Sequence, residues 1–233
     1  GHLGACTKHF AAYGAPTAGK EYNNVELSER TLREDYLPAY QAAVDAGSAM
    51  MMTSFNTLDR IPATGNQWLM RKILREEMGF EGVLVSDYNA IGELMTHGVA
   101  EDKKEAARQA LEAGTDLDMM SGCYMSSLEE LVKEGTIREE LIDEAVLRIL
   151  KLKNKLGLFE DPYRGLEEQS GIREIFTEEN RAKARKAAGD SMVLLENQEG
   201  FLPLKKQEKV AFIGPYAEDK HILGAWSFFG DIE

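Results

Sequence analysis

The sequence predicts an α/β protein whose strands run parallel and are joined by helices. Short apolar runs alternate with longer segments of helical period along most of the chain. Glycine or helix-capping residues separate the two kinds of segment. Strands that alternate with helices are connected by right-handed crossovers into a parallel sheet. An open doubly wound sheet and a (β/α)8 barrel both satisfy this pattern, which alone does not choose between them.

Four apolar runs are predicted to be strands, because each is a few residues long and is bounded by glycine or polar residues. They are Ala5–Phe10, Ser48–Phe55, Gly82–Ser86 and Thr115–Met120. Four strands are half of what a closed barrel requires.

The first predicted helix runs from Ser28 to Asp45, because apolar residues recur along one of its sides and Gly47 follows as a stop. Pro38 lies inside this segment. A proline removes one helical hydrogen bond and its ring clashes with the preceding turn. A kink or a break is therefore expected at Pro38.

Start and stop signals predict the later helices. Ser or Thr followed three residues later by Glu or Gln forms a capping box, which opens a helix. Such boxes stand at Thr64-x-x-Gln67, Ser127-x-x-Glu130 and Thr136-x-x-Glu139. The first precedes a helix over Trp68–Met78 that Gly79 ends, and Gly157 ends the last. Between them, the predicted helix Glu101–Ala113 carries a stripe of small residues suited to close packing on a sheet.

The helical pattern lapses between Phe159 and Phe176, in a stretch that contains proline, glycine and glutamate. Residues 160–176 are therefore predicted to be a linker between two domains. Residues 1–159 hold the α/β pattern described above.

After the linker, Thr177 is expected to cap a helix from Glu178 to Leu195, with acidic residues in its first turn. Lys209–Gly214 is predicted to be a strand. One helix and one strand cannot bury a core of their own. Residues 177–233 are thus interpreted as the beginning of a second domain, and the chain as truncated at both ends.

Composition excludes several partners. A net charge of −13 argues against nucleic acid and against an anionic membrane surface, because both need a basic face. A neutral sugar is compatible with that charge. Cys6 and Cys123 are too few for a disulfide framework or a structural zinc site. No apolar run approaches the roughly 18 residues of a membrane span. Localisation and oligomeric state stay open.

Asp87 is the first candidate for chemistry. It directly follows the unbroken apolar run that ends at Ser86, so it is expected at the carboxyl end of a strand. Ligands of parallel α/β folds bind at that edge. A carboxylate there, followed by Tyr88 as a sugar-stacking ring, suits the nucleophile of a glycosidase. By position alone, a helix-capping or loop role for Asp87 stays open.

Other strand ends carry weaker candidates. Lys8 and His9 can donate hydrogen bonds to sugar hydroxyls, although by position alone a solvated lysine and a loop histidine are the favoured explanation. Met52 and Phe55 belong to a cluster that strand packing also explains. Asp116 and Asp118 are expected in loop or capping roles.

Motifs for other chemistries are absent from the sequence. It contains no G-x-S-x-G, H-E-x-x-H, G-x-x-x-x-G-K-[ST] or G-x-G-x-x-G motif. Its four histidines are scattered without metal-ligand spacing. Neither a metal nor an organic cofactor is predicted.

Several ordered motifs resemble glycoside hydrolase family 3. Ala5–Gly14 is similar to its Lys-His-Phe segment, and Phe80–Tyr88 is similar to its nucleophile segment, G-F-x-G-x-x-x-S-D. Pro62–Thr64 and Leu74–Phe80 match between them at the expected spacing. Ser191–Asn197 with Leu202–Leu204 resembles the beginning of the family's second domain, and Lys209–Pro215 resembles that domain's first strand.

The resemblance implies a (β/α)8 barrel followed by an α/β sandwich domain, with the active site between them. Residues 1–159 would be the C-terminal part of the barrel and residues 177–233 the start of the sandwich. It implies that Asp87 is the nucleophile of a retaining β-glucosidase and that Lys8 and His9 hold the reacting sugar. Met52 and Phe55 would line that subsite, where the family often has a tyrosine in place of Phe55. Tyr88 would flank the leaving group.

The resemblance also implies where the second carboxyl lies. No histidine follows Lys8-His9-Phe10 in Ala11–Pro16, so the N-acetylglucosaminidase branch fits less well. In the two-domain β-glucosidase branch, the acid/base is a glutamate of the sandwich domain, expected here beyond Glu233. β-Xylosidase, α-L-arabinofuranosidase and phosphorylase activities stay open, as does a non-catalytic sugar-binding relative. The 233 residues alone are expected to be inactive.

Overall fold

The computed structural model describes residues 3–163, 177–215, 217–219 and 227. The chain divides into two compact units, residues 1–166 and 167–233, and each is described here by itself. Of the predicted linker, residues 164–176 lie outside the described residues, as do residues 228–233.

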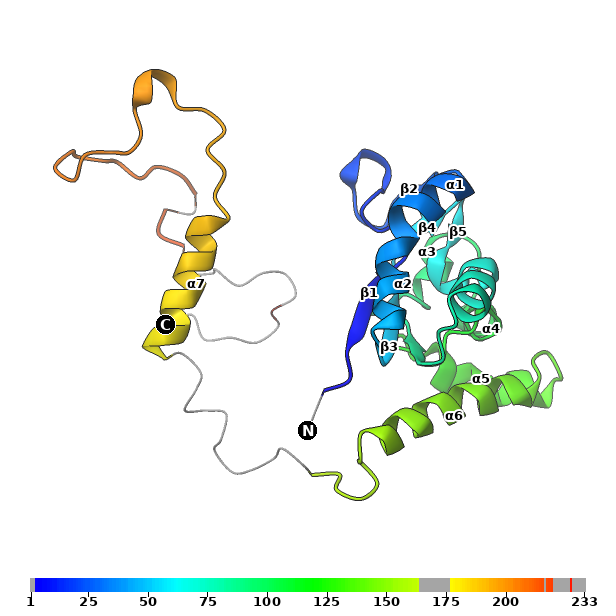
Figure 1. Ribbon diagram of the computed structural model, residues 1–233. Coiled ribbons are helices and arrows are strands. Elements are labelled where there is room, and N and C mark those ends of the chain that lie inside the picture. Colours follow the sequence, from blue (N-terminus) through cyan, green and yellow to red (C-terminus); the bar gives the residue numbers. More distant parts are fainter. Residues whose placement is uncertain (1–2, 164–176, 216, 220–226, 228–233) are drawn as a thin grey trace. The chain divides into compact units, whose positions relative to one another are not determined.

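The first unit is an α/β fold, as the sequence predicts (Figure 1). Its sheet consists of β1 (Cys6–Phe10), β3 (Met50–Thr53) and β6 (Val83–Val85) in the order β1-β3-β6, with all pairs parallel. These are three of the four predicted strands. The fourth, Thr115–Met120, is reduced to one parallel bridge between Val85 and Leu117. The strands therefore follow one another across the sheet in chain order.

A close backbone approach explains the glycine before β6. A Cβ atom on Gly82 would lie 2.4 Å from the carbonyl oxygen of Ala49 and 2.7 Å from the Phe80 ring. Both distances are shorter than van der Waals contact, so only glycine fits there. This contact holds the amino ends of β3 and β6 together.

A second, smaller sheet was not predicted. Its order is β2 (Asn24–Val25), β4 (Thr57–Leu58), β5 (Ile61–Pro62). β2 is parallel to β4, and β4 is antiparallel to β5. Strands of two residues are too short for an alternating pattern to show in the sequence.

The first helix begins with α1 (Glu29–Thr31), continues through a π-helical turn, Leu32–Tyr36 (η2), and ends as α2 (Leu37–Asp45). Of the kink or break expected at Pro38, the break is wrong, because the chain stays helical through it. The π-helical turn ends two residues before Pro38, whose missing N–H disrupts the regular hydrogen bonding.

The second helix is the π-helical segment Trp68–Glu77 (η4), followed by Gly79 with a φ of 70° as predicted. The predicted Thr64 cap is wrong. Asn66 accepts the Leu69 N–H at 3.0 Å in its place. Thr64 lies in the 3-10 turn Ala63–Gly65 (η3), and its hydroxyl bonds to that of Thr53 at 2.8 Å.

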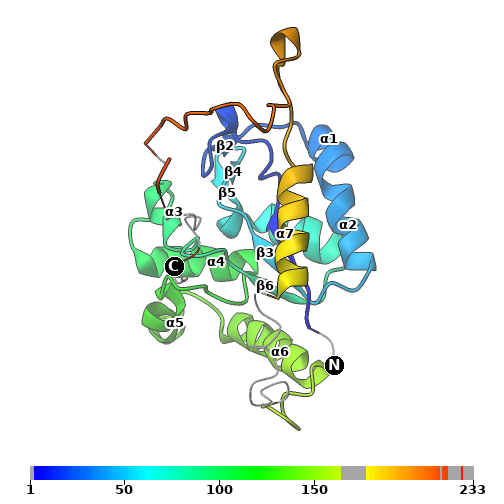
Figure 2. The same ribbon diagram turned by 90° about the vertical axis from the view of Figure 1, so that its left-hand side faces the viewer.

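The remaining helices of this unit are α3 (Glu93–Thr96), α4 (Lys103–Ala113), α5 (Cys123–Lys133) and α6 (Glu139–Lys155) (Figure 2). Gly114 ends α4 in the left-handed conformation. Two predicted capping boxes are wrong. Ser127 lies inside α5, and the N–H of Thr136 closes the turn after α5 by bonding to the carbonyl of Leu131.

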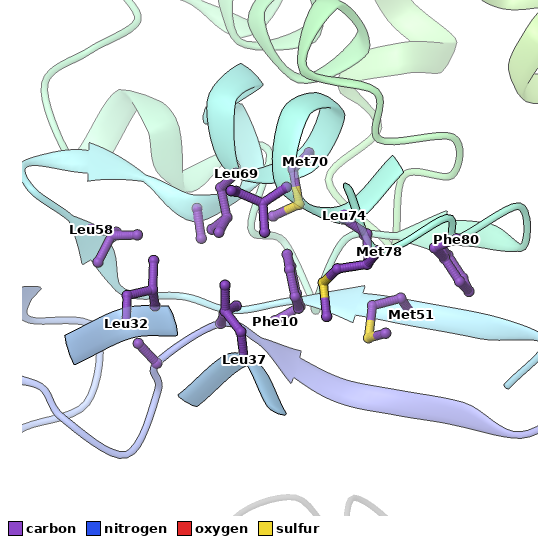
Figure 3. Packing of buried hydrophobic residues seen from close by; sticks show 14 of the residues in the cluster. Phe10, Leu32, Leu37, Met51, Leu58, Leu69, Met70, Leu74, Met78 and Phe80 are labelled. Atoms are coloured by element: carbon purple, nitrogen blue, oxygen red, sulfur yellow. The ribbon is translucent and has the colours of Figure 1, made fainter. Parts of the chain in front are cut away.

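Two groups of buried side chains form the core. The first joins the sheet to α2 and η4, and Figure 3 shows Phe10 and Met51 packed near Leu37 and Met78. The second joins α3, α4, α5 and α6 around Leu94. The small residues of α4 are fully buried there, but against neighbouring helices and not on the sheet, where their spacing predicts them. Helices thus fix the three strands from outside and leave their carboxyl ends at one edge.

The second unit holds α7 (Glu178–Asp190) and a 3-10 turn, Gln198–Gly200 (η6). Thr177 accepts the Asn180 N–H at 3.1 Å, which confirms the predicted cap. The helix ends earlier than predicted, after the poor helix formers Gly189 and Asp190. Lys209–Gly214 is not a strand. A strand needs a partner for its hydrogen bonds, and the described part of this unit contains no other strand.

Candidate active site

Asp87 lies just beyond β6, at the carboxyl edge of the sheet, and is only 5% exposed. Its backbone N–H donates to the Thr53 hydroxyl at 3.3 Å, and its Oδ1 accepts the Tyr88 N–H at 2.6 Å. The Thr53 hydroxyl in turn bonds to Thr64. Residues of β3 and of the following turn therefore hold the carboxylate in place.

The other oxygen of Asp87 is not satisfied. Oδ2 lies 3.9 Å from Lys8 Nζ and 3.2 Å from His9 Nε2. The Lys8 contact is too long for a hydrogen bond and the His9 contact is not aligned for one, so within the described residues this buried oxygen has no hydrogen-bond partner. Such an atom costs about 1–3 kcal/mol of desolvation and calls for an explanation in function or bound ligand. Oδ2 is the atom that is free to react or to bind.

An irregularity in β1 brings Lys8 and His9 to the same carboxylate. Thr7 pairs with Met51 and Phe10 pairs with Thr53, so two residues of β1 stand opposite the single residue Met52. Adjacent residues of a regular strand point to opposite faces, whereas a bulge re-aims one of them. This bulge explains how both side chains reach Asp87.

His9 is fixed from two sides. Its carbonyl accepts the Tyr40 hydroxyl of α2, and its ring lies 5.3 Å from that of Tyr13 in an edge-to-face arrangement. Burial, reinforced by the charge of Lys8, lowers the pKa of His9 below its ordinary value. The imidazole is therefore mainly neutral at neutral pH, and its contact with Asp87 is a polar contact rather than an ion pair.

The other predicted site residues occupy the same edge. Met52 is half-buried and stands opposite Val85 in the register of β3 and β6. The Phe55 ring is buried and lies 5.9 Å from the Tyr13 ring. Tyr88, next to Asp87, is 40% exposed.

Aromatic residues that sequence reasoning missed surround this group. Tyr13 and Tyr22 belong to the loop that follows β1, and the Tyr22 ring lies 4.6 Å from that of Phe55. Burial, followed by the charge of Glu21, raises the pKa of Tyr13 to about 12, so its hydroxyl stays protonated. The signal that could have found both tyrosines is their position in a loop after a strand that carries site residues.

Glu93 was also missed. It begins α3, and its Oε2 is buried without a hydrogen-bond partner among the described residues. Burial, and after it the negative charge of Asp87, raises the pKa of Glu93 to about 7. Its sequence position gives no hint of this, because the effect comes from burial beside a second carboxylate.

Asp118 has the capping role predicted for it, whereas Asp116, for which the sequence also predicts a loop or capping role, forms ion pairs. Asp116 Oδ2 accepts from Arg75 at 2.7 Å, and its Oδ1 accepts from Arg148 at 2.8 Å. Asp118 accepts the hydroxyl and the N–H of Ser121 and the N–H of Tyr124, so it holds the start of α5.

The described ranges contain no group of three or more His, Cys, Asp or Glu side chains arranged to hold a metal ion. Nor is any helix within them both long and apolar enough to span a bilayer.

Fold and site together define a parallel α/β protein with a carboxylate-centred site at the carboxyl ends of its strands. Residues 2–152 match the family model described as the glycosyl hydrolase family 3 N-terminal domain. The chain belongs to this family, which confirms the resemblance seen in its motifs.

Curated relatives and solved structures that resemble this chain agree with the family assignment. The periplasmic beta-glucosidase of Salmonella typhimurium is 43% identical over 227 residues, which are 96% of this chain and 30% of that protein. A beta-xylosidase of Formosa agariphila is 36% identical over 98% of this chain and 33% of its own length. A beta-glucosidase from Listeria innocua, solved in complex with glucose, is 54% identical with a TM-score of 0.83, over 99% of this chain and 32% of that one. The chain thus spans about a third of these relatives.

Proposed function

We propose that the chain is part of a retaining glycoside hydrolase that removes β-linked glucose from the non-reducing end of its substrates, with Asp87 as nucleophile. The observation that carries the proposal is the buried, unpartnered Oδ2 of Asp87 between Lys8 and His9. The similarity to beta-glucosidases supports the choice of sugar.

In this mechanism Asp87 Oδ2 attacks the anomeric carbon. The bond from that carbon to the leaving oxygen breaks while an acid protonates the oxygen. A glycosyl ester of Asp87 forms, and water then hydrolyses it with the same acid now acting as base. The two carboxyl groups of such a pair stand about 5–5.5 Å apart. The second one is proposed to be a glutamate of the sandwich domain, beyond Glu233, as the family resemblance implies.

The surrounding side chains then have distinct tasks. Lys8 and His9 donate hydrogen bonds to hydroxyls of the reacting sugar, since both present nitrogen donors beside Asp87. Met52 and Phe55 line the apolar part of that subsite. Tyr88 flanks the leaving group. No step requires a metal or an organic cofactor.

The proposed architecture follows the family. Residues 1–159 would form the later part of a (β/α)8 barrel, residues 160–176 the linker, and residues 177–233 the start of an α/β sandwich. The parallel order β1-β3-β6 and the bridge to Leu117 are compatible with consecutive barrel strands. The isolated 233 residues should lack activity, because half a barrel leaves open strand edges. Measurable turnover by them would contradict this.

The test is Asp87→Gly in the full-length enzyme, assayed on aryl β-glucosides. Hydrolysis should be abolished, and added azide should restore turnover and give the α-glucosyl azide, because the small anion attacks from the vacated side. Asp118→Asn, at the same sheet edge, is the matched control and should keep wild-type hydrolysis. Wild-type activity in Asp87→Gly would remove Asp87 as nucleophile.

A second candidate function is β-xylosidase activity, which the similarity to beta-xylosidases favours. α-L-Arabinofuranosidase and phosphorylase activities use the same Asp87 chemistry. A panel of aryl glycosides, assayed with and without phosphate, separates all four by their kcat/KM values. Sugar binding without turnover of any of them would favour a non-catalytic relative.

A further inference from the structure

Two hollows meet at Trp68, the first residue of η4. One has a volume of about 310 Å³ and reaches Glu29 of α1, and the other has a volume of about 380 Å³ and reaches Arg108 of α4. Both are lined by Ile61, Asn66 and Trp68, so they form one continuous groove. Each volume lies in the range of about 300–1,000 Å³ that is usual for small-ligand sites. This Trp68 groove therefore has room for a ligand of more than one ring.

The indole of Trp68 gives the groove an exposed aromatic surface. Trp68 is 38% exposed, while Leu69 and Met70, the next two residues of η4, are fully buried. The buried residues anchor the helix to the core, so the indole stands on a fixed element. An aromatic ring held in this way offers a ligand a large apolar face at little entropic cost.

Polar groups without partners surround the indole. Asn66 is only 4% exposed, and its Oδ1 accepts the Leu69 N–H, but its Nδ2 has no hydrogen-bond partner among the described residues. An unpaired polar group on a buried side chain that lines a hollow calls for a ligand or a water. The carboxylate of Asp59 and the side-chain amide of Gln67 also line the groove, and in the described part of the chain they too lack partners.

The turn that carries Asp59 is held in one shape. Asp59 and Arg60 join β4 to β5 with φ values of 52° and 66°, the left-handed pair that defines a type I′ turn. Arginine rarely adopts this conformation, which persists only where surrounding contacts enforce it. Asn24 supplies them, because its Oδ1 accepts the Thr57 hydroxyl at 2.7 Å and the Arg60 N–H at 3.2 Å. Asp59 therefore lines the groove from a fixed position.

The charges along the groove disfavour an ionic ligand. Glu29 and Asp59 repel anions, and Arg108 is already paired with Glu105 and Glu112. A cation carries no acceptor for the unpaired amide donor of Asn66. A hydroxyl can donate to a carboxylate and accept from an amide, so a neutral ligand that carries several hydroxyls satisfies all of these groups.

We propose that the Trp68 groove is a second carbohydrate site, which binds a β-linked glucose oligosaccharide. The equatorial hydroxyls of β-linked glucose leave two apolar faces on each ring, which suit stacking on the indole. None of the residues proposed to hold the reacting sugar at Asp87 lines the groove. A chain held there would raise the local concentration of sugar ends at Asp87. The choice of glucose rests on the proposed function, whereas the groove itself does not.

The experiment is electrophoresis of the full-length enzyme in native gels that contain a soluble mixed-linkage β-glucan. The glucan should retard the wild type, and Trp68→Ala should lower its association constant by about tenfold. Asn66→Asp keeps the oxygen that caps η4 but replaces the free donor by an acceptor, and should lower the constant by about fivefold. Tyr163→Ala is the control, because it removes a 75% exposed ring that does not line the groove, and it should migrate like the wild type.

Hydrolysis of an aryl β-glucoside is the second readout. This substrate needs only the site at Asp87, so its kcat and KM should stay within about twofold of the wild type in all three variants. If Trp68→Ala does not fold, Asn66→Asp alone decides, since it is nearly isosteric.

Three results would overturn the inference. A wild type that the glucan does not retard has no such site, and unchanged retardation of both groove variants would assign the binding to the site at Asp87. Equal losses of retardation and of aryl β-glucoside hydrolysis would mean that Trp68 and Asn66 serve the fold. In contrast, retardation that depends on Trp68 in an enzyme that hydrolyses no aryl β-glucoside would refute the proposed function and support the groove.

Discussion

Two buried aspartates, Asp116 and Asp87, lie at opposite edges of the sheet and differ in their hydrogen-bond partners. Asp116 is 6% exposed, and both its oxygens accept from guanidinium groups, those of Arg75 and Arg148. Its Oδ2 also accepts the Leu84 N–H at 2.8 Å. Asp87 is 5% exposed, but only its Oδ1 has a hydrogen-bond partner among the described residues. The two aspartates are thus equally buried, but only Asp116 has hydrogen-bond partners for both of its carboxylate oxygens.

The difference distinguishes a carboxylate with a structural role, Asp116, from the one proposed to react, Asp87. The Arg75 guanidinium that serves Asp116 also donates to the carbonyls of Phe80 and Gly82, at the start of β6. That cluster therefore stabilises the amino edge of the sheet, where residues of α/β barrels contribute stability. Asp87 stands at the carboxyl edge, where catalytic groups lie. For both residues, the number of hydrogen-bond partners of the carboxylate and its edge of the sheet indicate the same role: structural for Asp116 and catalytic for Asp87, as proposed.

The largest effect is expected from Asp87→Asn in the full-length enzyme. Replacing the proposed nucleophile by an amide should lower kcat by about 10⁴-fold or more. Stability should be unchanged within about 1 kcal/mol, because one amide replaces a carboxylate that was only partly satisfied. Initial rates and urea unfolding measure the two quantities. A loss of stability as large as the one expected for Asp116 would erase the contrast.

Asp116→Asn should show the reverse pattern. It removes the carboxylate that pairs with Arg75 and leaves Arg148 with only the partly exposed Glu144, and breaking such a cluster costs about 3–5 kcal/mol. Activity per folded molecule should stay near that of the wild type at a temperature where the variant is folded. Urea unfolding, with the folded fraction set against kcat, provides the measurement.

Arg148→Met is the matched control for Asp116→Asn. It removes one of the two guanidinium groups and leaves Asp116 paired with Arg75. Its cost in unfolding free energy should be clearly smaller than that of Asp116→Asn. Similar costs for both variants would mean that packing at this edge, rather than charge, sets the stability.

The two aspartates also show what a sequence can reveal. The apolar run before Asp87 predicts a strand and hence places the residue at its carboxyl end, because strand position depends on local pattern. The partners of Asp116 lie 41 and 32 residues away along the chain, and local pattern carries no information on them. The bulge that turns both Lys8 and His9 to Asp87 is likewise invisible in the sequence. The periodicity of apolar residues predicts helices and strands. The hydrogen-bond partners of a buried group depend on tertiary contacts, which the periodicity does not contain.

Glu93 provides a smaller, pH-dependent test of the carboxyl edge. Its pKa is raised to about 7 in the folded protein by burial and by Asp87, from an ordinary 4.5, and Tyr22 is the other titratable group beside it. The unfolded chain therefore releases this proton first, so the free energy of unfolding falls as pH rises from 4.5 to about 7. Because Glu93 is only partly buried, solvent screening reduces the effect to about 1–2 kcal/mol.

Glu93→Gln should remove this contribution. The difference in Tm between the variant and the wild type should grow between pH 4.5 and about 7 and then stay constant. Thermal unfolding followed across that range measures it. A Tm difference that stays constant across this pH range would show that the Glu93 carboxyl ionises as it does in the unfolded chain. Burial beside Asp87 would then not disfavour its charged form.

The smallest effect is expected at Asp118, which tests whether the edge of the sheet or the missing hydrogen-bond partner marks a carboxylate as reactive. Asp118 lies near the carboxyl edge like Asp87, but its carboxylate accepts from Ser121 and from the Tyr124 N–H at the start of α5. If the presence of hydrogen-bond partners decides the role, Asp118→Ala should leave kcat unchanged. It should lower the free energy of unfolding by about 1 kcal/mol, the usual cost of losing a helix-capping side chain. Asp118→Asn keeps one acceptor oxygen and should cost less. Urea unfolding and initial rates of the two variants, compared with Asp87→Asn, give the answer. A large fall in kcat without a fall in stability would mean that position at this edge, and not the missing hydrogen bond, marks a carboxylate as reactive.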